Sequence, residues 1–178
     1  VDPYARTTGV NGERGMVIDL NSTNPESGWN EIEDQPESYT DATIYELHVR
    51  DFSIDDSSGV KDEWQGKFMA LTEEGTTVNG VKGNPSTGLD YMKEMGFTHL
   101  HLLPIYDYGS VDETKCDTFN WGYDPVNYNT PEGSYSTDPY NGEVRVKEMK
   151  EMVDTLHKNN IGVIMDVVYN HVSVSYTH

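Results

Sequence analysis

One short segment late in the chain gathers side chains that can carry out polar chemistry. In "IMDVVYNHV" an apolar run ends on a carboxylate (Asp166), a phenol (Tyr169), an amide (Asn170) and an imidazole (His171). If the segment stays extended, the alternation of side chains places Asp166 and Asn170 on one face. Two interpretations stay open from these residues alone: a ligand site, or a buried hydrogen-bonded carboxylate beside an ordinary loop histidine.

A second segment, "FNWGYDPVNY" at residues 119–128, is rich in aromatic rings. It holds four rings within ten residues, with Asp124 as its only charge. Rings such as Trp121 and Tyr123 either pack into a core or offer a flat surface to a ligand. A pyranose suits such a surface, because its C–H faces pack on aromatic planes while its hydroxyl edges need directed hydrogen bonds.

Runs with strand character must position these segments. They lie at residues 43–49 ("TIYELHV"), 98–104 ("THLHLLP") and 161–168 ("IGVIMDVV"). The last two are apolar at nearly every residue, which is typical of strands covered on both faces. The histidines in and beside the first two runs lack metal-ligand spacing and are expected to be hydrogen-bonded core or barrel-mouth residues: His48, His99 and His101.

Two segments with helical periodicity separate these strands. In "GLDYMKEMG" apolar residues recur every three positions, and Gly96 is placed to end the helix in a left-handed cap. Residues 141–160 repeat the pattern at steps of three and four, with apolar positions at Val146, Met149, Val153 and Leu156. The order strand, helix, strand, helix, strand predicts a parallel α/β fold with right-handed crossovers.

The connections after the first two strands are long. Residues 51–87 and 105–142 each run for more than thirty residues, whereas each helix leads into the next strand within a few. Connections of that length inside a compact domain are usually functional. Both leave the carboxyl ends of strands, where barrels and open α/β sheets place their active sites.

Composition narrows the classes of partner. Lys and Arg number 12 against 31 Asp and Glu, so the formal charge of -19 repels nucleic acid and anionic lipid. A neutral, hydroxyl-rich ligand fits better, and no apolar run reaches the roughly 20 residues of a membrane helix. The single Cys116 excludes an internal disulfide framework and a four-cysteine metal site. The compartment stays open, with an extracellular or cell-surface location favoured over the cytoplasm.

Several motifs, taken in order, resemble one family. "DVVYNH" resembles the first conserved region of the α-amylase superfamily of (β/α)8-barrel glycoside hydrolases, where it marks the end of the third strand. Together with "YELHVRDFS", "THLHLLPIYDYGSVDE" and "NWGYDPVNYNTPEGSYSTDP", it is similar to the type I pullulanases, debranching enzymes of glycoside hydrolase family 13. The pullulanase pattern has Tyr where Phe119 stands, a departure that loses only a hydroxyl.

The resemblance implies a domain arrangement. Residues 41–178 would form strands 1 to 3 of a partial (β/α)8 TIM barrel, and residues 1–20 would end a β-sandwich carbohydrate-binding module. Within that first part, "NGERGMVIDL" would be a closing strand. Residues 21–40 are polar and acidic, and they read as a linker that wraps on a neighbour.

The resemblance also implies roles for single residues. Tyr123 would stack on the glucose at the scissile subsite, and His171 would hydrogen-bond a hydroxyl of that sugar. Asp166 would support the site by pairing with an Arg near the nucleophile. Asn170 matches a calcium position of many α-amylases, but pullulanases often lack that ion, so no cofactor is required. Trp121 and Asp124 complete the expected substrate-binding set.

Neither catalytic carboxylate of the family has a counterpart here. Retaining glycosidases need a nucleophile and a general acid about 5 Å apart, and the family carries them after the fourth and fifth strands. No catalytic residue is therefore assigned. These 178 residues are expected to be an inactive fragment that needs the remainder of the barrel.

The expected function is that of a debranching enzyme that cleaves α-1,6-glucosidic links in pullulan, amylopectin or glycogen. The alternatives are an isoamylase-like enzyme, another α-amylase superfamily member, or a glucan-binding protein without catalysis.

Overall fold

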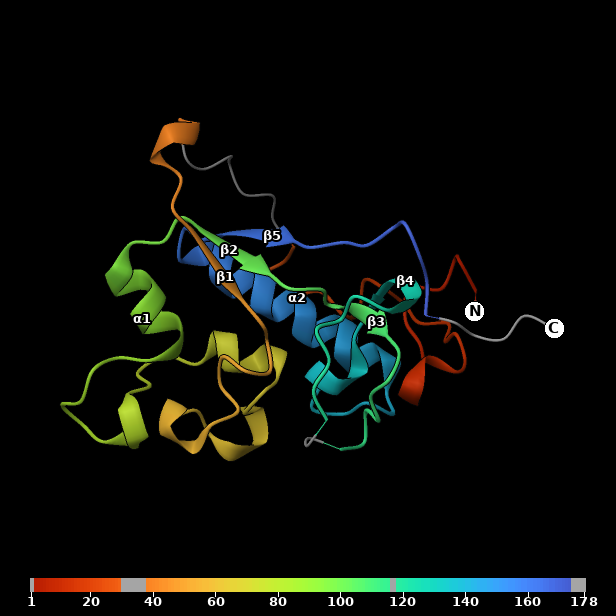
Figure 1. Cartoon of the computed structure of the whole chain (residues 1–178), viewed down its shortest axis with the longest axis horizontal. Coiled ribbons are helices and arrows are strands. Elements are labelled where there is room, and N and C mark those ends of the chain that lie inside the picture. Colours follow the sequence, from red (N-terminus) through yellow and green to blue (C-terminus); the bar gives the residue numbers. More distant parts are fainter. Residues whose placement is uncertain (1, 30–37, 116–117, 174–178) are drawn as a thin grey trace.

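The computed structural model describes residues 2–29, 38–115 and 118–173 of the chain (Figure 1). Its strands are β1 (Ile44–Leu47), β2 (His99–Leu102), β3 (Tyr106–Tyr108), β4 (Pro125–Pro131) and β5 (Gly162–Met165). Its α-helices are α1 (Gly88–Met95) and α2 (Gly142–Lys158). Its 3-10 helices are η1 (Val10–Gly12), η2 (Tyr39–Asp41), η3 (Asp56–Ser58), η4 (Asp62–Trp64), η5 (Phe68–Thr72), η6 (Val78–Gly80) and η7 (Gly133–Tyr135). No helix in these ranges is both long and apolar enough to span a bilayer.

The three predicted strands form one parallel sheet in the order β1-β2-β5, with α1 and α2 as the connecting helices. The predicted α/β order is therefore confirmed, although each strand is shorter than the apolar run that predicted it. Gly96 ends α1 in the left-handed conformation, as expected, at φ 71°. Asn141 caps α2 by accepting a hydrogen bond from the Glu143 amide.

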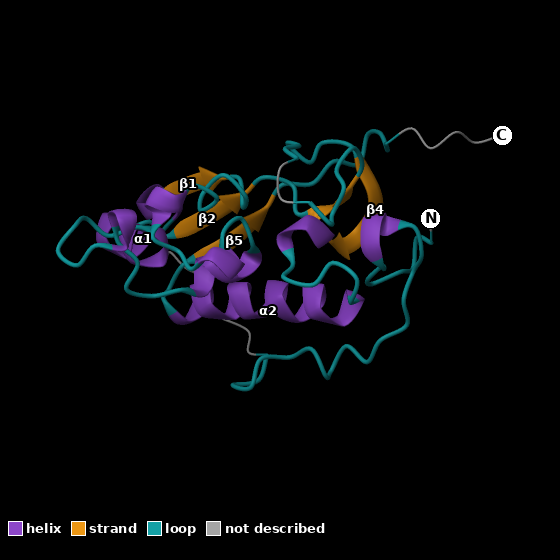
Figure 2. Ribbon diagram, turned by 90° about the horizontal axis from the view of Figure 1, so that it is seen from below, coloured by secondary structure: helices purple, strands orange, loops and turns teal. Residues whose placement is uncertain are grey.

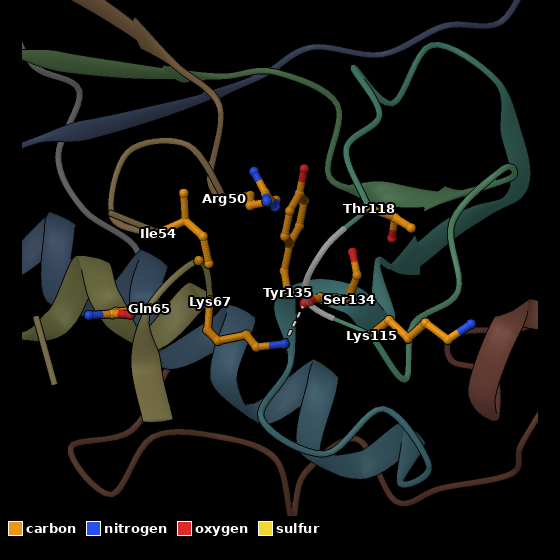
Figure 3. Close-up of a pocket in the computed structure, with 9 residues that line it drawn as sticks. Arg50, Ile54, Gln65, Lys67, Lys115, Thr118, Ser134 and Tyr135 are labelled. Atoms are coloured by element: carbon orange, nitrogen blue, oxygen red, sulfur yellow. Dashed lines mark hydrogen bonds between the residues drawn. The ribbon is translucent and has the colours of Figure 1, made fainter. Parts of the chain in front are cut away.

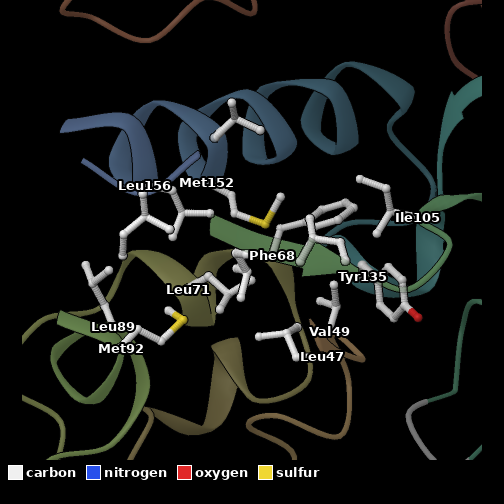
Figure 4. Packing of buried hydrophobic residues seen from close by; sticks show 14 of the residues in the cluster. Leu47, Val49, Phe68, Leu71, Leu89, Met92, Ile105, Tyr135, Met152 and Leu156 are labelled. Atoms are coloured by element: carbon white, nitrogen blue, oxygen red, sulfur yellow. The ribbon is translucent and has the colours of Figure 1, made fainter. Parts of the chain in front are cut away.

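The hydrophobic core fills the space between this sheet and the helices. Figure 2 shows α2 lying beneath the sheet, and Figure 4 shows the side chains that pack between them. Leu100 and Leu102 on β2 are fully buried against this layer. Phe68 and Leu71 of η5 are buried with them, so the first long connection supplies core packing. Each such side chain contributes about 1.5–3 kcal/mol by leaving water.

The opposite face of the sheet is only partly covered within the described residues. It carries Glu46 and His101, which the register places side by side on β1 and β2, and both side chains keep substantial exposure. The expectation that the second strand is covered on both faces is therefore not met here. Its alternation of His and Leu makes one face polar.

The second long connection contains a hairpin that the sequence does not predict. β3 and β4 pair antiparallel, with irregular register around Asp107. β4 buries Asn127 and Thr130 and has Pro at both ends, so polar side chains take positions where apolar ones are expected. A strand with that inverted pattern gives no hydrophobic alternation to detect.

The N-terminal segment runs along α2. Lys150 donates hydrogen bonds to the Leu20 carbonyl, Thr23 and Asn24, at 2.7–2.8 Å. Residues 11–20 contain no strand; the one β contact of this segment is a bridge between Thr8 and Gly15.

A buried ionic group, here called the carboxylate cluster, joins three parts of the chain. It consists of Asp107 on β3, Glu113, Glu132 after β4, and Arg145 on α2, and all four are at most 3% exposed. Arg145 Nη2 lies 2.9 Å from Glu113 Oε2, which also accepts from the Asn11 amide. Asp107 lies 4.0 Å from the same guanidinium, and Glu132 lies close to both acids, so three buried carboxyl groups are gathered around one positive charge.

This imbalance raises the proton affinity of the acids. Burial raises the pKa of Glu132 to about 8, and the nearby Glu113 and Asp107 add to the shift. Burial also raises the pKa of Asp107 to about 7. The cluster therefore holds protons near neutral pH, because a second and third buried negative charge would lack a partner.

Stability should consequently fall as the pH rises. The ordinary pKa values of these two groups are 3.8 and 4.5, so the unfolded chain releases protons that the folded chain keeps. The stabilising effect of the protonated acids is complete below about pH 4 and lost by about pH 8. We expect the thermal midpoint of the full-length protein to decline over this window, and less steeply in Glu132→Gln. An equal decline in both proteins would contradict the assignment.

Candidate functional site

The carboxyl end of β5 brings three of the predicted site residues together. The Tyr123 hydroxyl donates to Asp166 Oδ2 at 2.6 Å, and His171 Nε2 lies 2.6 Å from the Tyr123 carbonyl. Because a carbonyl only accepts, His171 Nε2 carries the hydrogen, and in the neutral imidazole Nδ1 then has a lone pair. The site therefore offers a phenol ring, a carboxylate and an imidazole acceptor.

The chain after Asp166 is tied to β4. The Tyr128 hydroxyl donates to the His171 carbonyl at 2.8 Å, and the Ser173 amide donates to the Pro125 carbonyl at 2.8 Å. The rings of Tyr128 and Tyr169 lie 5.6 Å apart. These contacts hold His171 beside the residues that precede β4.

Those residues, 119–124, form what we call the aromatic loop. Asn120 holds it together: its side chain donates to the Gly109 carbonyl at 2.8 Å and to Asp124 Oδ1 at 2.9 Å. The same side chain accepts from the Gly122 amide at 2.9 Å. Asp124 is thus engaged in shaping the loop.

The rings of the aromatic loop face outward. Trp121 is 59% exposed and Tyr123 is 38% exposed, and Phe119 meets Trp121 edge to face at 5.5 Å. The hydrogen bond to Asp166, together with partial burial, raises the pKa of Tyr123 to about 12. Tyr123 therefore stays a neutral phenol that can donate while its ring meets an apolar surface.

Gly122 lets the aromatic loop pass close to the end of β2. Its φ is +87°, and a Cβ at this position would lie 2.8 Å from the Pro104 carbonyl oxygen. Gly122→Ala should therefore lower the free energy of unfolding by about 1–3 kcal/mol more than a substitution without this clash. Gly83→Ala is the control, because Gly83 has φ +94° and open space around it. The free energy of unfolding of both variants is measured by denaturant unfolding. An equal decrease in the two variants would contradict the prediction, because it would show that the clash at Gly122 is relieved.

Two residues join the site that the sequence did not single out as ligands. His101 Nε2 lies 4.0 Å from Asp166 Oδ2, and His101 Nδ1 lies 3.7 Å from Glu46 Oε2. Glu46, His101 and Asp166 lie next to one another because of the parallel register of the strands. The register aligns Glu46 with His101 and brings the end of β5 beside them. The Glu46–His101 pairing could be found only once the strands are aligned.

The remaining predicted residue is Asn170. Asn170, the position that the resemblance linked to calcium, is exposed. Within the described ranges, one set of carboxylates lies close enough to share a cation, and it is Asp107, Glu113 and Glu132. Arg145 already supplies a positive charge to that set, which does not include Asn170.

A small cavity lies beside Tyr135 (Figure 3). Its volume is about 10 Å³, and Tyr135, Thr118 and Lys67 contribute to its wall, with Lys67 donating to the Ser134 carbonyl. A cavity of this size holds about one water molecule. It is too small for a sugar, whereas the exposed rings of Trp121 and Tyr123 offer an accessible surface for ligand contact.

Comparison with known proteins gives a consistent result. Residues 50–178 match the family described as the catalytic domain of α-amylases. The pullulanase of Bacillus subtilis strain 168 is 46% identical over 175 residues, covering 97% of this chain and 23% of that protein. The chloroplastic pullulanase 1 of Arabidopsis thaliana is 35% identical over 212 residues, covering 99% and 21%.

Solved structures agree. The pullulanase of Paenibacillus barengoltzii in complex with maltohexaose and α-cyclodextrin aligns with a TM-score of 0.87 and 54% identity, over 96% of this chain and 26% of that chain. The chain therefore spans about a quarter of the length of the relatives it matches.

The family match covers well over half of the chain, and the parallel order β1-β2-β5 agrees with part of a TIM barrel. The resemblance to pullulanases that the motifs indicated is confirmed by these relatives. The chain belongs to the α-amylase family.

Proposed function

We propose that the full-length protein is a pullulanase-type debranching enzyme. It would cleave α-1,6-glucosidic links in pullulan, amylopectin or glycogen with retention of configuration. The observation that carries this proposal is the hydrogen-bonded group of Tyr123, Asp166 and His171 at the carboxyl end of the sheet. The relatives described above are pullulanases, and one of them was solved with maltohexaose.

The geometry suits a neutral sugar. The Tyr123 ring would take the C–H face of a glucose, while its hydroxyl stays fixed on Asp166. His171 Nδ1 would accept a hydrogen bond from a sugar hydroxyl, since Nε2 is directed at the Tyr123 carbonyl. Trp121, on the same loop, would extend the platform to a neighbouring glucose.

The remaining parts of the mechanism lie on other strands. Retaining hydrolysis needs two carboxyl groups about 5 Å apart, which act as nucleophile and as general acid and base. We infer that the part of the protein that continues the barrel supplies both. Asp166 and Asp124 are assigned neither role, because each is engaged in holding the aromatic loop.

The N-terminal segment would continue from a β-sandwich carbohydrate-binding module. Its open side supports this proposal: Tyr4 and Val17 are largely exposed, as expected for residues that pack against a further domain.

The test is the linkage preference of the full-length protein. We expect hydrolysis of pullulan to yield products with only α-1,4 links, and no cleavage of amylose, which lacks α-1,6 links. Cleavage of amylose would favour an α-amylase instead. Binding of pullulan without hydrolysis would favour a glucan-binding protein that lacks catalysis. An isoamylase-like enzyme would cleave branched glucans and leave pullulan largely intact.

A further inference from the structure

We propose that His48 is a positioning residue for the aromatic loop. This inference rests on the proposed function, because the loop matters as a sugar platform only if the protein binds glucans. His48 directly follows β1, at the carboxyl edge of the sheet, and is 7% exposed. It does not belong to the predicted sugar-binding set, and it acts through Asn120.

The contacts of His48 point directly at the start of the loop. Its Nε2 lies 2.8 Å from the Asn120 carbonyl oxygen, and its ring lies 4.9 Å from that of Phe119. The buried Tyr135 hydroxyl lies 3.1 Å from the same nitrogen. The imidazole thus fills the space between the end of β1 and the first two residues of the loop.

The tautomer of His48 follows from the hydrogen-bond partners of its two ring nitrogens. The Asp51 amide donates to Nδ1 at 3.4 Å, which requires a lone pair on that nitrogen. Nε2 therefore carries the hydrogen, and the Asn120 carbonyl, which can only accept, receives it. The Asn120 carbonyl accepts its hydrogen bond from a buried imidazole. If His48 is replaced by a side chain without a donor, this carbonyl loses its partner.

The position of Asn120 affects that of Tyr123 through hydrogen bonds within the loop. The side chain of Asn120 accepts from the Gly122 amide, and Tyr123 is the next residue. The Asn120 side chain also donates to the Gly109 carbonyl and to Asp124, the residue that follows Tyr123 in the sequence. His48 therefore fixes the residue on which the hydrogen bonds inside the loop converge, while Asp166 and His171 hold Tyr123 from the opposite side.

The test compares three replacements of His48 in the full-length protein. Gln can bring an amide N–H near the position of Nε2, whereas Asn is too short and Phe keeps the ring without a donor. We expect the Gly122 amide to exchange with deuterium about tenfold faster in His48→Phe and His48→Asn. The peptide spanning residues 118–125 should return to near wild-type exchange in His48→Gln. His157→Phe, at a half-buried position in the last turn of α2, is the matched control.

Activity supplies a second readout. If Tyr123 is displaced, kcat for pullulan should fall about tenfold in His48→Asn and His48→Phe, and His48→Gln should stay within about threefold of the wild type. Two results would overturn the inference: unchanged exchange of residues 118–125 in His48→Asn, or equal defects in His48→Gln and His48→Asn. If the wild type does not act on pullulan, the proposed function fails, and the exchange measurement still decides the role of His48.

Discussion

Replacing Arg145 with methionine is expected to lower the free energy of unfolding by about 3–5 kcal/mol. Arg145 is fully buried, and it donates to Glu113, to Thr8 and to the carbonyls of Gly9, Pro131 and Pro139. Without the guanidinium, three carboxyl groups would share a buried space with no positive charge. That loss is a large part of the 5–15 kcal/mol that typically stabilises a domain.

Acid should partly restore the variant. The raised pKa values of Asp107, about 7, and Glu132, about 8, leave both groups neutral at pH 5 and increasingly charged towards pH 8. Fewer buried charges then lack a partner in the acid, which makes the defect smaller at pH 5 than at pH 8. The measurement is denaturant unfolding of the full-length protein at both pH values. Lys147→Met is the matched control, because Lys147 lies on the same helix with an exposed side chain. An Arg145→Met variant as stable as this control would contradict the importance of the cluster.

Replacing Tyr123 with alanine is expected to lower kcat/KM for pullulan by about 10- to 100-fold while the protein stays folded. The removed ring would have buried apolar surface against a glucose, which is worth about 1.5–3 kcal/mol. Tyr123 is 38% exposed, so its removal is not expected to cause a large loss of folding stability.

Two further variants separate the ring from the hydroxyl. Tyr123→Phe keeps the stacking surface and loses the hydrogen bond to Asp166, so its loss should be smaller, about tenfold or less. Tyr140→Ala is the control, because Tyr140 is a 64% exposed tyrosine that is not part of this loop. A folded Tyr123→Ala variant with wild-type kcat/KM would remove the ring from the sugar site.

The secondary structure of the barrel region could be predicted because its signals are local. The apolar spacing of α2, the glycine that ends α1 and the three apolar runs each lie within one element. The short strand lengths could not be predicted, since an apolar run does not show where hydrogen-bonded pairing stops. β5 ends at Met165, which makes Asp166 the first residue of the loop.

The buried polar parts escaped prediction for a different reason. Arg145 is not one of the apolar positions that define the helical pattern of α2, yet it is fully buried, because its partners come from distant segments around Thr8 and Glu113. The hairpin β3-β4 is hidden by the same chemistry, because Asn127 faces Asp107 where an apolar residue would normally lie. Polar burial depends on tertiary partners, which a local pattern does not contain.

The candidate site could be predicted in part. Tyr123, Asp166 and His171 were selected by their resemblance to a known family, and the structure brings them within hydrogen-bonding distance across more than forty residues of sequence. The support from His48 was not predicted, because it depends on where the aromatic loop crosses the end of β1.

The most direct test of the sugar platform is a crystal structure of the full-length protein with maltotriose. A glucose ring should lie face-on over Tyr123, with carbon atoms within about 4.5 Å of the phenol ring. His171 Nδ1 should lie within about 3.2 Å of a hydroxyl of that glucose. Maltotriose bound at the carboxyl end of the sheet without contacting Tyr123 or His171 would contradict the account.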